Sequence, residues 1–190
     1  MGVLRLAHVD VRTPDLELST AYYTEVLGLR LAARDDGAAY LKGWDEEDHH
    51  SLRLRADTRT GLDLFSFRVE AEHDLEVLER RLEAYGCHVQ RVSRGEAVGQ
   101  GESIRFEIPS GQTMELVWEL ERTGNLLGKR NPAPVPPPLP GIAPPRMDHL
   151  LINAEEVGEA YAFFRDVLDF RLTEQVLDAN GHQLGVWLER

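Results

Sequence analysis

The feature that most constrains this sequence is an internal repeat, in which one segment matches a later one without a gap at a fixed offset of 141 residues. Apolar matches alone could come from two unrelated amphipathic helices, but a histidine that precedes the helix falls at the same offset. Duplication is therefore the better interpretation, and it predicts the same order of elements in both copies. The matched pairs are His8 with His149, Ala21 with Ala162, Tyr22 and Tyr23 with Phe163 and Phe164, Glu25 with Asp166, Val26 and Leu27 with Val167 and Leu168, Leu29 with Phe170, and Arg30 and Leu31 with Arg171 and Leu172.

The first copy begins with an alternating segment, LRLAHVDV at 4–11, which is typical of a half-buried strand. The turn at 13–15 can cap a helix over 17–27, where apolar residues recur at helical spacing and Gly28 follows as a stop. Three strands complete a β-α-β-β-β unit, and the same order then returns. The predicted strands of the first unit are 29–34, 38–44 and 51–55, and the second unit has a strand at 62–69, a helix at 75–85 and strands at 88–92, 103–108 and 113–119.

A proline-rich stretch separates these two units from a third one. Residues 131–145 hold most of the ten prolines, so we expect an extended segment without regular structure. The third unit is predicted to have a strand at 147–153, a helix at 158–168, a strand at 171–177 and a strand ending at Glu189, without its last strand. We predict an α+β fold of paired β-α-β-β-β modules that form open barrels. Its expected parts are an N-terminal two-module domain at 1–124, a linker at 125–145 and the first module of an incomplete C-terminal domain at 146–190.

Composition excludes several classes of partner. A formal net charge of −12 opposes binding to the phosphates of nucleic acids, and the basic residues form no dense run. No stretch approaches the roughly 20 apolar residues that a membrane span needs. The single cysteine and the absence of a secretory pattern at the start lead us to expect a cytoplasmic protein.

Three motifs resemble the vicinal oxygen chelate superfamily: IPSGQTMELVW at 108–118, RMDHLLI at 146–152 and FFRDVLDFRLTEQVLDANG at 163–181. Within that superfamily, RMDHLLI followed by EQVLDANG is most similar to catechol 2,3-dioxygenases, and YLKGWDEEDHHSLRLR at 40–55 is similar to their N-terminal domain. The resemblance covers nearly the whole chain apart from the linker. It implies two similar domains per subunit, with Fe(II) held only in the C-terminal one.

The resemblance also implies three iron ligands, a histidine on the first strand of the third module and a histidine and a glutamate of the fourth. His149 occupies the first of these positions. Two imidazoles and one carboxylate on one face of Fe(II) leave the other face open to a catecholate and O2, and the implied product is a hydroxymuconic semialdehyde. The other two ligands and the family's acid-base histidine and tyrosine would lie beyond Arg190. We therefore expect no catalytic residue, no stably bound iron and no turnover in these 190 residues, which we interpret as part of a longer enzyme.

Two further interpretations stay open. The chain could be a short paralogue that binds a small aromatic ligand without turnover. The incomplete third module also has unpaired strands and an exposed apolar face, so we expect homo-oligomers.

The N-terminal domain contains a second possible metal site. By the family pattern, His8 and Glu115 occupy its first and last ligand positions, but the middle position is Leu64, which cannot coordinate. We interpret His8 and Glu115 as remnants of a duplicated site, the alternative being a metal held with another residue or water. His49 and His50 follow four acidic residues and are interpreted as part of a solvated charged loop. Surface or capping positions are predicted for His73, His88 and His182, and a semi-buried, unreactive position for Cys87.

Overall fold

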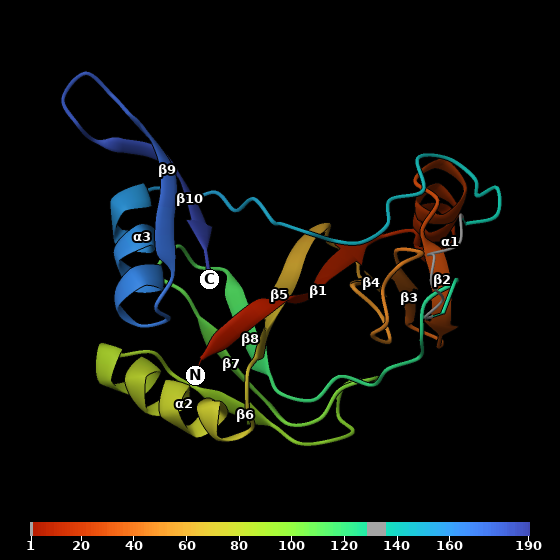
Figure 1. Cartoon of the computed structure of the whole chain (residues 1–190), viewed down its shortest axis with the longest axis horizontal. Helices are drawn as coiled ribbons and strands as arrows, with labels where there is room; N and C mark the ends of the chain where they lie inside the picture. The colour runs from red at the N-terminus through yellow and green to blue at the C-terminus, as the bar shows by residue number, and fades with distance from the viewer. Residues whose placement is uncertain (1, 129–135) are drawn as a thin grey trace.

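The computed structural model describes residues 2–128 and 136–190, and its largest element is an open, mixed sheet of eight strands (Figure 1). Two modules build this sheet, in the strand order β2-β3-β4-β1-β5-β8-β7-β6. The first module consists of β1 (Val3–Thr13), α1 (Leu16–Ala21), the π-helical turn η1 (Tyr22–Val26), β2 (Arg30–Arg34), β3 (Ala38–Lys42) and β4 (Leu52–Ala56). The second consists of β5 (Gly61–Val69), α2 (His73–Tyr85), β6 (Gln90–Val92), β7 (Ser103–Glu107) and β8 (Thr113–Val117).

The two modules join at their first strands. β1 pairs with β5 in antiparallel register and with β4 in parallel register. β5 pairs in turn with β8 in parallel register, so each module places its first strand next to its last. This arrangement repeats the same topology on both sides of the join, as the predicted β-α-β-β-β order requires.

The first helix starts where the sequence predicts but changes its hydrogen bonding half-way. The Asp15 side chain caps α1, and Gly28 ends the segment with φ +78°. An α-helix over the whole of 17–27 is wrong, because the second half is the π-turn η1. Thr20 and Thr24 both donate their hydroxyl to the carbonyl four residues earlier, a contact that distorts helices.

The helix of the second module follows the prediction closely. Leu75, Leu78 and Leu82 form its buried stripe, and Gly86 at φ +107° ends it with its N–H bonded to the Leu82 carbonyl. With 13 residues, α2 is the longest helix in the described part of the chain. No helix of residues 2–128 and 136–190 is long and apolar enough to cross a membrane.

The third module repeats the spacing of the first. Its helix α3 (Val157–Asp166) and strand β9 (Arg171–Leu177) begin 141 residues after α1 and β2 begin, as the duplication predicts. β9 pairs with β10 (Gln183–Glu189) in a separate two-stranded sheet. Figure 1 shows this hairpin projecting beside α3, at the end of the molecule away from α1.

Helix α3 packs into the main apolar core together with the second module. Phe163 is fully buried, and its ring centroid lies 5.1 Å from that of Tyr85 and 6.2 Å from that of Phe106. Beside it, Arg81 of α2 donates a 2.7 Å hydrogen bond to the carboxylate of Asp169. The third module is therefore held by side chains of the first 110 residues.

The strand predicted at 147–153 is wrong: no residue of this segment lies in a strand. β1, its counterpart, pairs with β4 and β5, and the described residues after 135 form no strands equivalent to those two. Met147, Leu150 and Ile152 instead pack, partly buried, against the main core. From residue 149 to residue 153 exposed and partly buried side chains alternate without the hydrogen-bonded ladder, whereas Met147 lies outside this alternation.

The predicted linker docks on the first module. Residues 136–145 contain no helix or strand, in agreement with the prediction, and 129–135 lie outside the described residues. The Trp44 indole donates a 3.0 Å hydrogen bond to the Ala143 carbonyl, and the Pro145 carbonyl accepts one from the backbone of residue 45. The segment therefore has a defined path along the sheet.

Candidate functional site

One face of the eight-stranded sheet is apolar and packs under the helices, whereas the other carries buried polar side chains. The two kinds of residue alternate because successive side chains of a strand point to opposite faces. In β8, for example, Met114 and Leu116 belong to the main core, and Glu115 between them points the other way. We refer to the side chains of His8, Asp10, Arg53, Ser66, Arg105 and Glu115 as the polar face.

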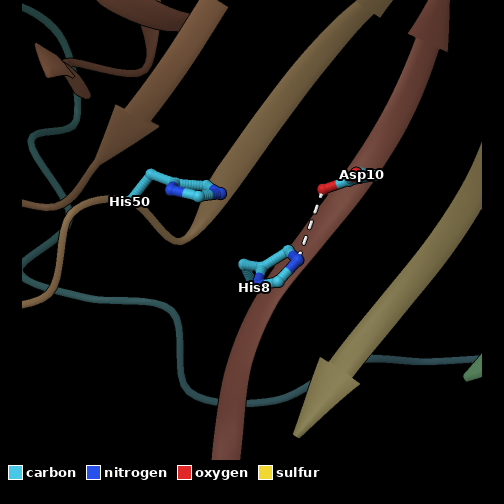
Figure 2. Close-up of side chains that lie close together, drawn as sticks. All are labelled: His8, Asp10 and His50. Atoms are coloured by element: carbon cyan, nitrogen blue, oxygen red, sulfur yellow. Dashed lines mark ion pairs between the residues drawn. The ribbon is translucent and has the colours of Figure 1, made fainter. Parts of the chain in front are cut away.

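Three buried side chains converge at this face: His8 and Asp10 from β1, and His50 from the loop before β4 (Figure 2). Each offers a ligand atom within 4.8 Å of the other two, and none of the three residues is more than 5% exposed. His8 Nε2 lies 3.6 Å from Asp10 Oδ1, and the two imidazole centroids are 5.0 Å apart. Figure 2 shows the His50 ring directed toward the other two side chains. Two imidazoles and a carboxylate form a donor set suited to divalent transition metals.

Two atoms of this group lack a hydrogen-bond partner among the described residues. They are Asp10 Oδ1 and His8 Nδ1, both shielded from solvent. The other carboxylate oxygen of Asp10 accepts a 3.0 Å bond from Arg53. Because buried polar atoms are nearly always paired, an unpaired carboxylate oxygen that faces two imidazoles calls for a physical reason.

The electrostatics of the group follow from its burial. Burial raises the pKa of Asp10, against the attraction of His8 and Arg53. Burial also lowers the pKa of His50 well below its usual range, and the neighbouring His8 and His49 act in the same direction. His50 is therefore a neutral imidazole at pH 7, the form that binds metals.

Glu115 lies next to this group but is fully engaged. Its carboxylate is 3.6 Å from His8 Nε2. Burial opposes ionisation, but His8, Arg105 and the donated hydrogen bonds outweigh it, so the pKa of Glu115 is lowered and it stays charged. The donors to its two oxygens are Ser66 Oγ at 3.0 Å, Gln100 Nε2 at 3.1 Å, Ser103 Oγ at 3.1 Å and Arg105 Nε at 2.6 Å.

Leu64 occupies the position predicted for it. β1 pairs with β4 in the way that β5 pairs with β8, and this matching makes Leu64 the counterpart of His8. Leu64 is buried and has no donor atom. The structure thus brings His8 and Glu115 together without a ligand at the symmetric position, and their description as remnants stays a prediction.

The prediction of a solvated loop at His49 and His50 is wrong. Both are buried, because the loop is tied to the chain after β8: the His49 N–H donates a 2.8 Å bond to the Glu121 carbonyl. The ring of Tyr40 contacts both imidazoles, and their Nδ1 atoms are 2.9 Å apart. The preceding acidic residues suggested an exposed loop. The contact with residue 121, which buries the loop, cannot be recognised from the sequence near His49 and His50.

The remaining histidines and the cysteine agree with the sequence. His73, His88 and His182 are exposed, and Cys87 is half-buried. Burial raises the pKa of the Cys87 thiol, so at neutral pH it stays protonated and unreactive.

His149 lies on the outer side of the extended segment at 147–153. Its side chain is 89% exposed, on the same outward side as Leu151, and its Nδ1 lies 3.5 Å from Asp148 Oδ2. Within residues 2–128 and 136–190 it belongs to no group of three metal-binding side chains. A metal centre at His149 therefore does not fit the donors that this chain provides there.

Comparison with known proteins supports the resemblance read from the motifs. The family model described as the catechol 2,3-dioxygenase-like N-terminal domain matches residues 62–121. A metapyrocatechase of Pseudomonas sp. (strain CF600) is 39% identical over 98% of this chain and 62% of its own length. The crystal structure of the 2,3-dioxygenase LapB from Pseudomonas sp. KL28 superposes with a TM-score of 0.89 at 39% identity, over 99% of this chain and 66% of that one. The family model and these relatives are extradiol dioxygenases or domains of the catechol 2,3-dioxygenase type, and the chain is similar to them over nearly its whole length.

A manganese-dependent 2,3-dihydroxybiphenyl 1,2-dioxygenase of Geobacillus genomosp. 3 is 30% identical over 98% of this chain and 60% of its own length. The chain thus spans about three fifths of the length of the curated extradiol dioxygenases that it matches. The predicted α+β fold of paired modules is confirmed, with a sheet that stays open.

Proposed function

We propose that the whole protein to which this chain belongs is a metal-dependent extradiol dioxygenase, which cleaves a catechol-type diol with dioxygen. The observation that carries the proposal is the 39% identity to a metapyrocatechase over 189 residues, which includes the third module as well as the first two. We propose Fe(II) as the metal, as the family resemblance implies, with manganese as the alternative that a second relative uses.

Within this chain, we propose His149 as the first of three metal ligands, with the other two supplied by residues that the chain does not contain. The exposed imidazole and its outward orientation support this role, because a ligand at an open site must face its partners. Its contribution is to hold the metal beside the substrate. We also propose the division into a domain at 1–124, a linker at 125–145 and a catalytic module that starts at 146.

The test compares two polypeptides: this chain alone, and a chimera in which it is followed by the last third of the LapB dioxygenase. After anaerobic loading with Fe(II) or Mn(II), each receives catechol and air, and the yellow ring-cleavage product is recorded by absorbance. We expect product from the chimera alone, and its loss in H149A but not in H182A, which removes an exposed histidine of the same module. Product from this chain alone, or an active H149A chimera, would refute the assignment.

We further propose that the third module associates with a second copy of the chain. Its hairpin and extended segment expose large apolar side chains, a pattern typical of an interface. These side chains are Leu151, Val176, Leu177, Leu184 and Trp187. A dimer or larger species by light scattering, converted to a monomer by Trp187→Ser, is the expected result, and a monomer at tens of micromolar would contradict it.

A further inference from the structure

We propose that His8, Asp10 and His50 bind one divalent transition-metal ion of the Zn²⁺ and Fe²⁺ class, which joins β1 to the loop before β4. The family pattern instead pairs His8 with Glu115, and neither Asp10 nor His50 appears in it. The inference does not rest on the proposed ring cleavage, which depends on His149.

The first argument is the spacing of the donor atoms. Two ligand atoms about 2.1 Å from one tetrahedral ion are about 3.4 Å apart. His8 Nε2 and Asp10 Oδ1 are 3.6 Å apart, which is too long for a hydrogen bond and close to the separation of two ligands on one ion. All three ligand atoms lie within 4.8 Å of one another, so binding requires the His50 ring to approach by up to about 1.4 Å.

The second argument is the unpaired oxygen. Asp10 Oδ1 is buried without a hydrogen-bond partner among the described residues, although it faces two imidazoles. A carboxylate in such a place is costly unless something positive reaches it. Arg53 pairs with the other oxygen of this carboxylate, and a bound cation would satisfy Oδ1 as well.

The third argument is the orientation of two of the three ligands, Asp10 and His50, by a neighbour. Arg53 takes Asp10 Oδ2, which leaves only Oδ1 for an ion. His49 Nδ1 lies 2.9 Å from His50 Nδ1, so it can accept a hydrogen bond from the N–H that His50 carries there when its Nε2 binds the metal. Outer contacts of this kind fix the tautomer and direction of metal ligands.

The charges near the group bear on whether an ion can enter. Two carboxylates, Asp10 and Glu115, stand against two guanidinium groups, Arg53 and Arg105. Each guanidinium bonds the carboxylate oxygen away from the one nearest His8, so both near oxygens, at 3.6 Å from Nε2, present negative charge to the same space. The four formal charges cancel, and an ion in that space would meet the two carboxylate oxygens rather than the guanidinium groups.

The experiment uses the full chain, freed of metal with a chelator and then titrated with Zn²⁺ and, separately, with Co²⁺. We expect one equivalent to bind by equilibrium dialysis, visible absorption bands of Co²⁺ in a low-symmetry site, and a melting temperature that rises with ion concentration. D10N and H50Q should each weaken binding at least about 10–100-fold, since changes even outside the ligand shell have that effect. H182A, which removes an exposed histidine beside a carboxylate, is the matched control and should bind as the unchanged chain does.

A measurement on the unchanged chain protects the test against variants that fail to fold. The Co²⁺-loaded protein should show paramagnetically shifted NMR signals from two imidazoles. No binding by the unchanged chain, signals from one imidazole or none, or binding that is lost in H149A and kept in H50Q would each overturn the proposal. Because these readouts are independent of ring cleavage, failure here leaves the proposed dioxygenase function standing, and the reverse also holds.

Discussion

Replacing Phe163 by alanine tests whether the third module is held by the core of the second. The side chain is fully buried between Tyr85, Phe106 and Phe164, with ring centroids 5.1, 6.2 and 5.7 Å away. A buried phenylalanine removes about 150–250 Å² from water, which at about 25 cal/mol per Å² corresponds to roughly 4–6 kcal/mol as an upper bound. Measured Phe→Ala changes in cores are about 3–5 kcal/mol, so we expect a loss of about 4 kcal/mol.

Urea unfolding followed by circular dichroism and tryptophan fluorescence measures this loss. With a slope of about 2–3 kcal/mol/M, the midpoint should fall by roughly 1–2.5 M. Leu151→Ala is the control, because this side chain in the same module is 86% exposed and its loss should cost less than about 0.5 kcal/mol. A loss below about 1 kcal/mol in F163A would refute the shared core.

Three further changes probe the first module. Lys42 donates hydrogen bonds to three oxygens, in the loop before β4 and in the chain after β8. K42M should therefore destabilise the protein by about 2–4 kcal/mol in the same urea assay, and an unchanged midpoint would contradict this. A Cβ at Gly43 would lie 2.2 Å from the Pro145 carbonyl, so Gly43→Ala should cost about 1–3 kcal/mol and speed proteolysis of the linker, whereas an unchanged digestion pattern would show that the linker is not docked there. The N–H of Gly37 bonds to the carboxylate of Asp35 and lowers its pKa, with Tyr40 adding to the effect. A lowered folded-state pKa gives stability that is present above the ordinary pKa near 3.8 and is lost as the pH falls through the folded value, so D35N should flatten the acid limb of the stability curve.

Much of the fold could be predicted because its signals are local or repeated. The capping carboxylate of Asp15, the glycine stops at 28 and 86 and the alternation in β1 act within a few residues. The internal repeat extends these predictions to the third module, where α3 and β9 begin 141 residues after α1 and β2 begin. The face of His149 also followed from alternation, although the segment that carries it forms no strand.

The rest depended on contacts between distant residues. His50 is buried because residues near 121 cover its loop, and an acidic run gives no hint of that cover. The segment at 147–153 has the pattern of a strand, but it pairs with no strand among residues 2–128 and 136–190. The change from α-helix to π-turn in the first module accompanies hydrogen bonds from two threonine hydroxyls to the backbone. The spacing of apolar residues, from which the helix is predicted, contains no information on these bonds.

Because α3 packs beside α2, the position of the third module, which carries His149, depends on residues of the second module. The aromatic residues that hold α3 in place through Phe163, such as Tyr85 and Phe106, lie some forty to sixty-five places before His149 in the sequence. On the proposed function, a mutational scan for activity in the whole protein should therefore find sensitive positions in the core around Phe163. On the same proposal, substitutions in that core can change activity while every metal ligand stays unchanged.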